Sequence, residues 1–256
     1  MARYKVILAY DGSAFRGSQR QAGLRTVQGE FERSLQKLGW SGRSIVLAGR
    51  TDTGVHASGQ VAAFDLDWSH TDEELLRALN SGLPADLSVR GVKGAAEKFH
   101  PRFDADSRCY RYEIYCDDIR NPLRERYAWR VWPEVGGSLL LQTAAVFTGR
   151  HDFAAFGSPT SPRGTTVRTV MKSEWKETPG GGWQFEIRAD AFLFRMVRRI
   201  VFVQVCAAQG RCDLAEVREA VSSNKAVLPP GLAPANGLTL VEVRYGSDRF
   251  KLETER

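Results

Sequence analysis

The sequence predicts an α+β fold made of two ferredoxin-like halves, each with the element order β-α-β-β-α-β. Three observations predict it. Strand-like and helix-like segments follow that order twice, and each predicted helix has apolar residues along one side. In addition, 43% of the 256 residues are hydrophobic, which is enough to form a core without disulfides or bound metal. Two such halves can abut as a continuous, mainly antiparallel sheet, with helices packed on one side and a central cleft. We place the N-terminal half, with the Asp52 loop, at residues 1–104 and the C-terminal half at residues 105–256.

The N-terminal half begins with a short apolar segment that ends in Asp-Gly and reads as a strand. Its first helix is expected at 26–38, where apolar residues recur at helical spacing and Thr26 is placed to cap the first turn. A second helix is expected from Thr71 to Leu79, with Glu74 completing a capping box. The strands of this half are predicted at 4–10, 45–48, 60–66 and 87–92.

The C-terminal half repeats this order more loosely. Residues 167–175 are rich in β-branched and aromatic residues, as is typical of a strand. The other strands are predicted at 109–115, 183–189 and 238–245, and the helices at 138–147, 192–209 and 213–222.

Charge and cysteine usage narrow the function classes. The formal net charge is +6, and 28 of the 36 basic residues are arginine, whose planar fork suits phosphate groups. An arginine bias of genomic origin would give the same numbers. The sequence contains no C-x-x-C pair, no cleavable leader pattern and no apolar run of membrane-spanning length. We therefore expect a cytoplasmic protein with reduced thiols.

The segment AGRTDTGVHASGQVAAFD, residues 48–65, combines Arg50, Asp52 and His56 with three glycines just before a predicted strand. Asp52 could close an Asx-turn, bind a metal ion or face a substrate. A deaminase-type zinc site requires His-x-Glu and a later Pro-Cys-x-x-Cys, and neither pattern follows His56. The flanking threonines and Gly54, which permits close backbone approach, favour a carboxylate presented at a ligand cleft.

Two segments of the C-terminal half could meet that carboxylate or the ligand. Arg195 stands three positions before Arg198 and four before Arg199 in a very apolar predicted helix, so the three guanidinium groups share one side of it. Each arginine must then either pair with a carboxylate or extend its charged end to solvent. Asp52 is a candidate partner, and a solvated arginine stripe is the alternative. In RCYRYEIY, Tyr110 shares a strand face with Arg108, which suits base stacking, although tyrosine is also a good strand residue.

Taken together, these segments resemble the TruA-type tRNA pseudouridine synthases. The resemblance covers residues 4–245 and is carried in order by YDGSAFRGSQRQ, TVQGEFE, GRTDTGVHASGQVAAF, RFDADSRCYRYEIY, NPLRERYAW, HDFAAFG, AFLFRMVRRI and APANGLTLVEV. The sequence departs from the family at Ser18, where members usually carry Trp, at Phe194, where they usually carry His, and at Pro101 in FHPR, where FHAR is usual.

The resemblance implies that the chain isomerises uridine to pseudouridine at positions 38, 39 and 40 of the tRNA anticodon stem-loop, as a homodimer without cofactor or metal. By position, Asp52 is the essential aspartate, Tyr110 stacks on the target base, Arg198 pairs with Asp52, and Arg50 fills the space that the flipped nucleotide leaves. A paired arginine would keep a buried carboxylate ionised. The alternatives are a non-catalytic RNA-binding protein and, third, an N-glycosidase.

Overall fold

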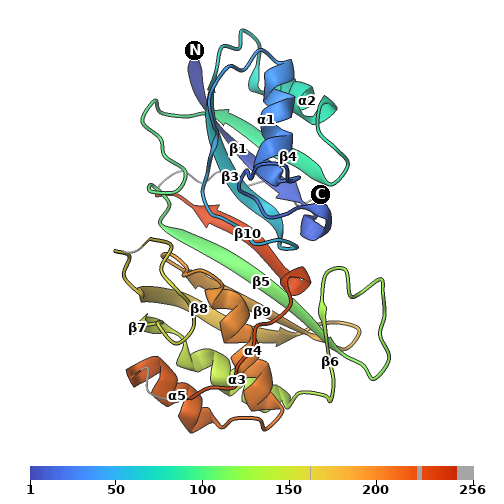
Figure 1. Cartoon of the computed structure of the whole chain (residues 1–256), viewed down its shortest axis with the longest axis vertical. Helices are drawn as coiled ribbons and strands as arrows, with labels where there is room; N and C mark the ends of the chain where they lie inside the picture. Colours follow the sequence, from blue (N-terminus) through green and yellow to red (C-terminus); the bar gives the residue numbers. More distant parts are fainter. Residues whose placement is uncertain (162, 224–226, 247–256) are drawn as a thin grey trace. The chain divides into compact units, whose positions relative to one another are not determined.

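The computed structural model describes residues 1–161, 163–223 and 227–246 (Figure 1). The chain divides into two compact units, here called the N-terminal and the C-terminal unit. Among the described residues, the N-terminal unit comprises residues 1–106 and 240–246, and the C-terminal unit comprises residues 107–161, 163–223 and 227–239. The polypeptide therefore returns to its first unit after completing the second.

The N-terminal unit is built around strand β1, Ala2–Tyr10. It pairs antiparallel with β3, His56–Leu66, on one side and with β4, Leu87–Gly94, on the other, while the short β2, Val46–Leu47, pairs with β3. All residues of β1 from Tyr4 to Leu8 are buried, as is Tyr10, and because successive side chains of a strand point to opposite faces, both faces of β1 are covered. This register places the start of β3, and the loop before it, beside the end of β1.

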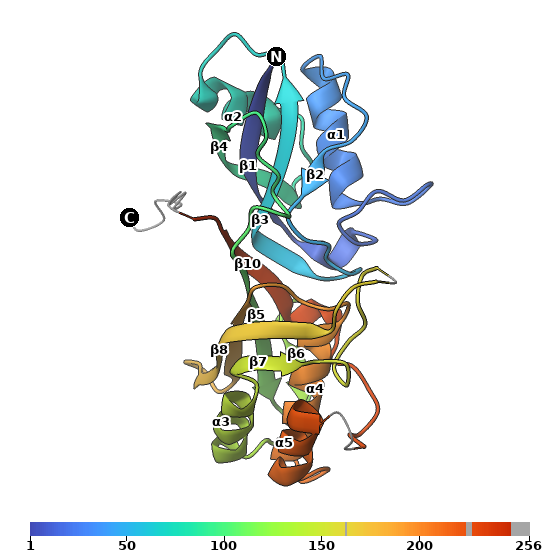
Figure 2. The same cartoon turned by 90° about the vertical axis from the view of Figure 1, so that its left-hand side faces the viewer.

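Two helices cover this core. Helix α1, Val27–Lys37, runs alongside β1 and β3 (Figure 2), and its Phe31 meets Phe64 of β3 edge to face. Thr26 caps α1 by accepting the N–H of Gly29, as predicted. Helix α2, Asp72–Ser81, carries the predicted capping box, and the main-chain carbonyl of its Leu79 accepts a hydrogen bond from Ser34 of α1.

Strand β10, Leu238–Arg244, crosses from one unit to the other in sequence. In the N-terminal unit it lies against Gly59 of β3 so closely that a Cβ atom there would be 2.2 Å from the carbonyl oxygen of Val241. A glycine is therefore required at this position of the loop-to-strand segment. The sequence had placed this strand in the C-terminal half, whereas from Leu240 it belongs to the N-terminal unit.

The C-terminal unit contains an antiparallel sheet in the order β5-β9-β8-β7. Its central strand β9, Trp183–Ala189, lies between β5, Ser107–Cys116, and β8, Val167–Glu177. Two short strands were not predicted: β7, Gly149–Asp152, pairs with β8, and β6, Trp129–Val131, runs parallel to β5. Both have fewer residues than a periodic pattern needs to be visible in a sequence.

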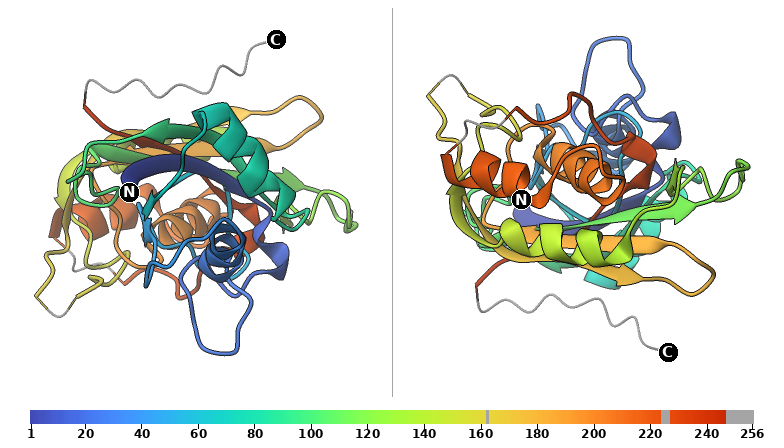
Figure 3. Two further views of the ribbon diagram at one scale, coloured as in Figure 1. Left: turned by 90° about the horizontal axis from the view of Figure 1, so that it is seen from above. Right: turned by 90° about the horizontal axis from the view of Figure 1, so that it is seen from below.

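Three helices group together in this unit: α3, Gly137–Val146, α4, Met196–Ala208, and α5, Leu214–Ser223 (Figure 3). Two hydrogen bonds attach α3 and α4 to β8. Ser173 Oγ donates to the carbonyl of Ala144, and the indole of Trp175 donates to Gln204, which is completely buried. The expected α+β class, with mainly antiparallel strands backed by helices, is confirmed.

Helix α4 differs from its predicted range, since it begins at Met196 and not at Phe192. Residues 192–194 are not helical, and Arg195 is in the left-handed region with φ 63°. Arg195 therefore lies outside the helix and does not share a helical stripe with Arg198 and Arg199, which corrects the sequence analysis. No helix in the described part of the chain is long and apolar enough to cross a bilayer.

Candidate active site

Asp52 occupies the first position of a tight turn that leads into β3. Its main-chain carbonyl accepts the N–H of Val55 at 3.1 Å, and Gly54, the third residue of the turn, has φ 81°. This is the conformation of a type II turn, which favours glycine at that position. The Asp52 side chain is half-buried, between buried Thr51 and exposed Thr53.

The residue before Asp52 is fixed by the segment after β1. Thr51 N–H donates to Ser18 Oγ at 2.8 Å, and Ser18 N–H donates to the Thr51 carbonyl at 3.0 Å. The Thr51 hydroxyl also shares a hydrogen bond of 2.8 Å with the phenol of Tyr10, and burial raises the pKa of that phenol. The N–H, the carbonyl and the hydroxyl of Thr51 are thus all satisfied inside the protein, and the main chain entering Asp52 has little freedom.

The start and the end of the loop are anchored as well. Gln60, completely buried in β3, donates its amide to the carbonyl of Gly49 at 2.8 Å and accepts the Gly49 N–H at 3.3 Å. The main-chain N–H of Gly12 donates to Nδ1 of His56 at 3.0 Å, and Oδ1 of Asp11 lies 3.3 Å from the same nitrogen. The two contacts hold the loop on both sides of the turn.

Gly12 begins a short 3-10 turn, Gly12–Ala14, and packs directly on the Asp52 turn. A Cβ atom at Gly12 would lie 2.1 Å from the carbonyl oxygen of Val55. The atoms that it would meet belong to the main chain of Gly54 and Val55, so they could not move aside without shifting the turn. The close approach explains why the sequence has glycine after Asp11.

Arg50 extends from the same loop and is exposed. Within the described ranges its side chain makes no hydrogen bond or ion pair in the protein. A guanidinium without a partner on a rigid loop is suited to an anionic or stacking ligand.

Tyr110 lies on β5 in the C-terminal unit, opposite Ile187 of β9. Its side chain is only 8% exposed, and its ring meets the ring of Phe192 edge to face, with centroids 5.1 Å apart and planes at 89°. Phe192 therefore fixes the Tyr110 ring from the side. The open base-stacking face expected for this strand is instead largely buried, since Tyr112 and Ile114 belong to the core.

Arg198 stands in the first turn of α4, where its Nε donates to the carbonyl of Ala233 at 2.7 Å. Arg199 donates to the carbonyls of Pro229 and Gly231. Both arginines are half-buried and hold the Pro-rich segment before β10, so they do not form a solvated stripe. Burial lowers the pKa of Arg199 from its ordinary value.

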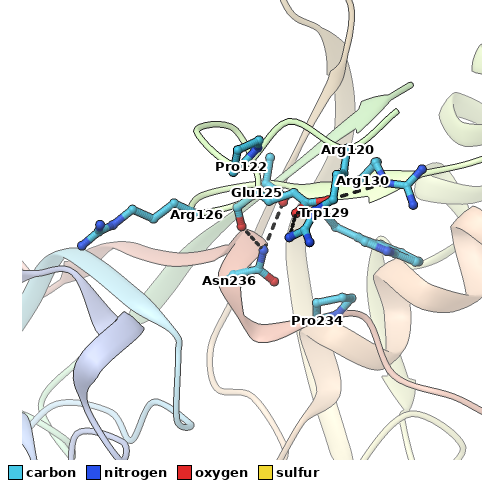
Figure 4. A pocket seen from close by; sticks show the side chains of 9 residues that line it. Arg120, Pro122, Glu125, Arg126, Trp129, Arg130, Pro234 and Asn236 are labelled. Carbon is cyan, nitrogen blue, oxygen red and sulfur yellow. Dashed lines mark hydrogen bonds and ion pairs between the residues drawn. The ribbon is translucent and has the colours of Figure 1, made fainter. Parts of the chain in front are cut away.

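The segment held by Arg198 is fastened at further points. The phenol of Tyr112 donates to the Pro234 carbonyl at 2.7 Å, and Asn236 donates to the carbonyls of Glu125 and Ala128. Figure 4 shows Asn236 pointing toward Glu125 across a pocket of about 490 Å³, where Glu125 also pairs with Arg120. Since Tyr112 is almost fully buried, its pKa is raised well above the ordinary value, and it stays a hydrogen-bond donor.

The predicted site residues thus fall into two sets. Asp52 and Arg50 share one loop of the N-terminal unit, and Tyr110 and Arg198 lie in the C-terminal unit. The pairing of Asp52 with Arg198 stays a prediction.

The residues that support the Asp52 loop give little signal in the sequence. Ser18 stood out only as a departure from the family pattern, and the polar side chain of Gln60 in an otherwise apolar strand was the available signal for its role. Phe192 could not be singled out among the apolar residues around it.

Comparison with known proteins identifies the family. The model of the tRNA pseudouridine synthase family matches residues 6–104 and 143–246. The chain is 38% identical over 251 residues to tRNA pseudouridine synthase A of Chloroflexus aurantiacus, covering 96% of this chain and 89% of that protein. It is 37% identical to the proteins of the same name from Limosilactobacillus fermentum and Pseudothermotoga lettingae, covering 96% of this chain and 97% and 100% of theirs. The chain belongs to the tRNA pseudouridine synthase family and is an isomerase.

Proposed function

We propose that the chain converts uridine to pseudouridine at positions 38, 39 and 40 of the tRNA anticodon stem-loop, with Asp52 as the essential catalytic group. The observation that carries the proposal is the anchoring of the Asp52 loop. Ser18 and Tyr10 hold the residue before Asp52, and Gly54 shapes the turn after it. A reactive group must be held in one geometry to be effective, and this loop restrains one carboxylate in that way.

The reaction breaks the N1–C1′ bond of uridine, turns the base and joins C5 to C1′. The proton on C5 is lost and N1 gains one, so the reaction consumes no other reactant. Asp52 serves by attacking the sugar, by attacking the base or by removing a sugar proton, and each of these roles requires an ionised carboxylate. Water must be kept away from the sugar while the base is detached, because it would otherwise trap C1′.

The target uridine must leave its stack, which costs a few kcal/mol. Tyr110 offsets part of that cost by stacking on the extruded base, and Phe192 keeps its ring in position. Arg50 fills the space that the nucleotide leaves; its exposed guanidinium supports this role. Arg198 is assigned as the partner of Asp52, and the hydrogen bond from its Nε atom to the Ala233 carbonyl supports this role by holding the side chain in one position.

The protein works in the cytoplasm, as a homodimer in which one tRNA contacts both subunits. Its positive charge, +6 on each chain, favours association with the tRNA backbone.

Mapping of pseudouridine in tRNA incubated with the purified protein tests this function. The matched control is the same tRNA with cytidine at positions 38, 39 and 40. We expect pseudouridine at these positions in the first tRNA and none in the control. Pseudouridine at other positions would contradict the site assignment. Binding without any modification would favour an RNA-binding protein, and release of free uracil an N-glycosidase.

A further inference from the structure

The three residues just before Arg195 differ in exposure, and only the last of them is exposed. Phe192 contacts Tyr110, Leu193 is buried, and Phe194 is 48% exposed. Phe194 lies two residues from Phe192, so their Cα atoms are at most about 7 Å apart. An exposed aromatic ring therefore stands close to the residue that fixes Tyr110.

The main chain holds Phe194 in this outward position. Its N–H donates to the carbonyl of Ser158 at 2.8 Å, and the two residues form an isolated β-bridge. Gly157 packs so closely that a Cβ atom there would lie 2.8 Å from the Phe194 carbonyl oxygen. The exposed ring is thus part of an ordered structure and not of a loose loop.

Arg195, the next residue, has φ 63° and ψ 7°, and no other non-glycine residue in the described ranges has a positive φ. This conformation is unfavourable for a side chain with a Cβ atom, and such residues cluster at functional sites. It coincides here with a specific contact: the Arg195 guanidinium lies over the Phe194 ring, 4.7 Å from its centroid.

The Arg195 side chain is exposed, and it makes no hydrogen bond or ion pair with the residues that the structure describes. Arg198 and Arg199, by contrast, donate to main-chain carbonyls. Arg195 therefore keeps its donors available for a ligand while its planar group is held against an aromatic ring.

We propose that Phe194 and Arg195 form a stacking platform for an unpaired nucleobase that flanks the target uridine, with Arg195 also contacting its phosphate. The proposal rests on the proposed function, which places the target base at Tyr110. Unpaired RNA bases stack on aromatic rings and on guanidinium planes, and both surfaces are present here. An apolar protein partner would gain nothing from the unpaired charge of Arg195, which it would have to bury.

Binding of unmodified tRNA tests the platform, measured in an Asp52→Asn background so that the bound RNA is not converted. Phe194→Ala should raise the dissociation constant about 5- to 150-fold, the range for loss of one stacked base. Phe194→Trp should bind within about threefold of the parent, and Phe194→Leu should bind as weakly as Phe194→Ala, because stacking needs a π face. Leu141→Ala is the matched control, since Leu141 of α3 is 49% exposed, and it should bind like the parent.

Two further measurements locate the contact. Arg195→Ala should weaken binding and lower the slope of log affinity against log salt concentration by about one. A tRNA with 5-iodouridine at one position next to the target should crosslink to Phe194 under ultraviolet light. A Phe194→Ala protein that binds as tightly as the Leu141→Ala control would overturn the platform, as would equal binding by the Leu and Trp variants. Either result would leave the mapping of modified positions, and so the proposed function, intact.

Discussion

Substitution of Ser18 by alanine should loosen the loop that carries Asp52. Ser18 is completely buried, and its Oγ atom accepts the N–H of Thr51, the residue before Asp52, at 2.8 Å. Alanine removes the acceptor but leaves the N–H donor in place. A buried donor without a partner costs about 1–3 kcal/mol.

The unpaired N–H can affect the protein in two ways. If the loop stays in place, the free energy of unfolding falls by about 1–3 kcal/mol. If the loop moves to find another partner, Asp52 is displaced, and the same energy corresponds to a fall in kcat of about 5- to 150-fold. We expect the second effect to dominate, because the hydrogen bond to Ser18 Oγ is one of the contacts that fix the main chain just before Asp52.

Urea unfolding and the rate of pseudouridine formation should be measured on the same Ser18→Ala preparation. Ser41→Ala is the control, since Ser41 is exposed in the same unit and its hydroxyl makes no hydrogen bond with any described residue. Affinity for tRNA should change less than about twofold, because Ser18 is buried away from any ligand. If Ser18→Ala matches Ser41→Ala in both stability and turnover, the hydrogen bond to Thr51 does not hold the loop.

Three other substitutions test separate parts of the account. Gly12→Ala should lower turnover at least about tenfold, because the new methyl group would push the Asp52 turn out of place, whereas Gly94→Ala, which meets no atom within 4 Å, should be neutral in the same rate assay. Arg198→Met should reduce kcat far more than tRNA affinity, and a loss of affinity with unchanged turnover would make Arg198 a phosphate contact. Asp86→Asn should lower the free energy of unfolding by about 1 kcal/mol at pH 7. Both Asp86 oxygens accept hydrogen bonds from the half-exposed Arg25, and these bonds lower the pKa of Asp86. Because the Asp86 pKa is lower in the folded state than its unfolded value of about 4, the ionised side chain stabilises the protein above that pH. In urea titrations, the difference in unfolding free energy between the wild-type and Asp86→Asn proteins should therefore shrink as the pH falls below about 4. A difference that is constant down to about pH 2 would refute the role of this ion pair.

The sequence predicts most of the fold because its helices and long strands have clear periodicity and caps. Thr26 and the box of Thr71 with Glu74 mark helix starts that the structure reproduces. The start of α4 is different. Its apolar pattern continues upstream without a break, and only the left-handed conformation of Arg195 shows where the helix begins. Local pattern cannot reveal a conformation that is maintained by contacts with a distant loop, here through Ser158.

The sequence predicts which residues belong to the candidate site but not the contacts that hold them in place. Asp52 was singled out by its neighbours in one loop, which sequence can show. Two of the residues that fix this loop, Tyr10 and Ser18, come from another segment, and Gln60 lies in the strand that follows. They are joined to the loop by hydrogen bonds between residues 11 to 41 positions apart. Such bonds depend on tertiary packing and leave no spacing pattern in the sequence.

Release of tritium from tRNA labelled at C5 of uridine tests the role of Asp52 most directly, since C5 loses its hydrogen only when it becomes bonded to the sugar. Asp52→Asn keeps the size of the side chain and removes its charge. The wild-type protein should release tritium, and the Asp52→Asn protein should release none while still binding tRNA. Tritium release at the wild-type rate by Asp52→Asn would contradict the account.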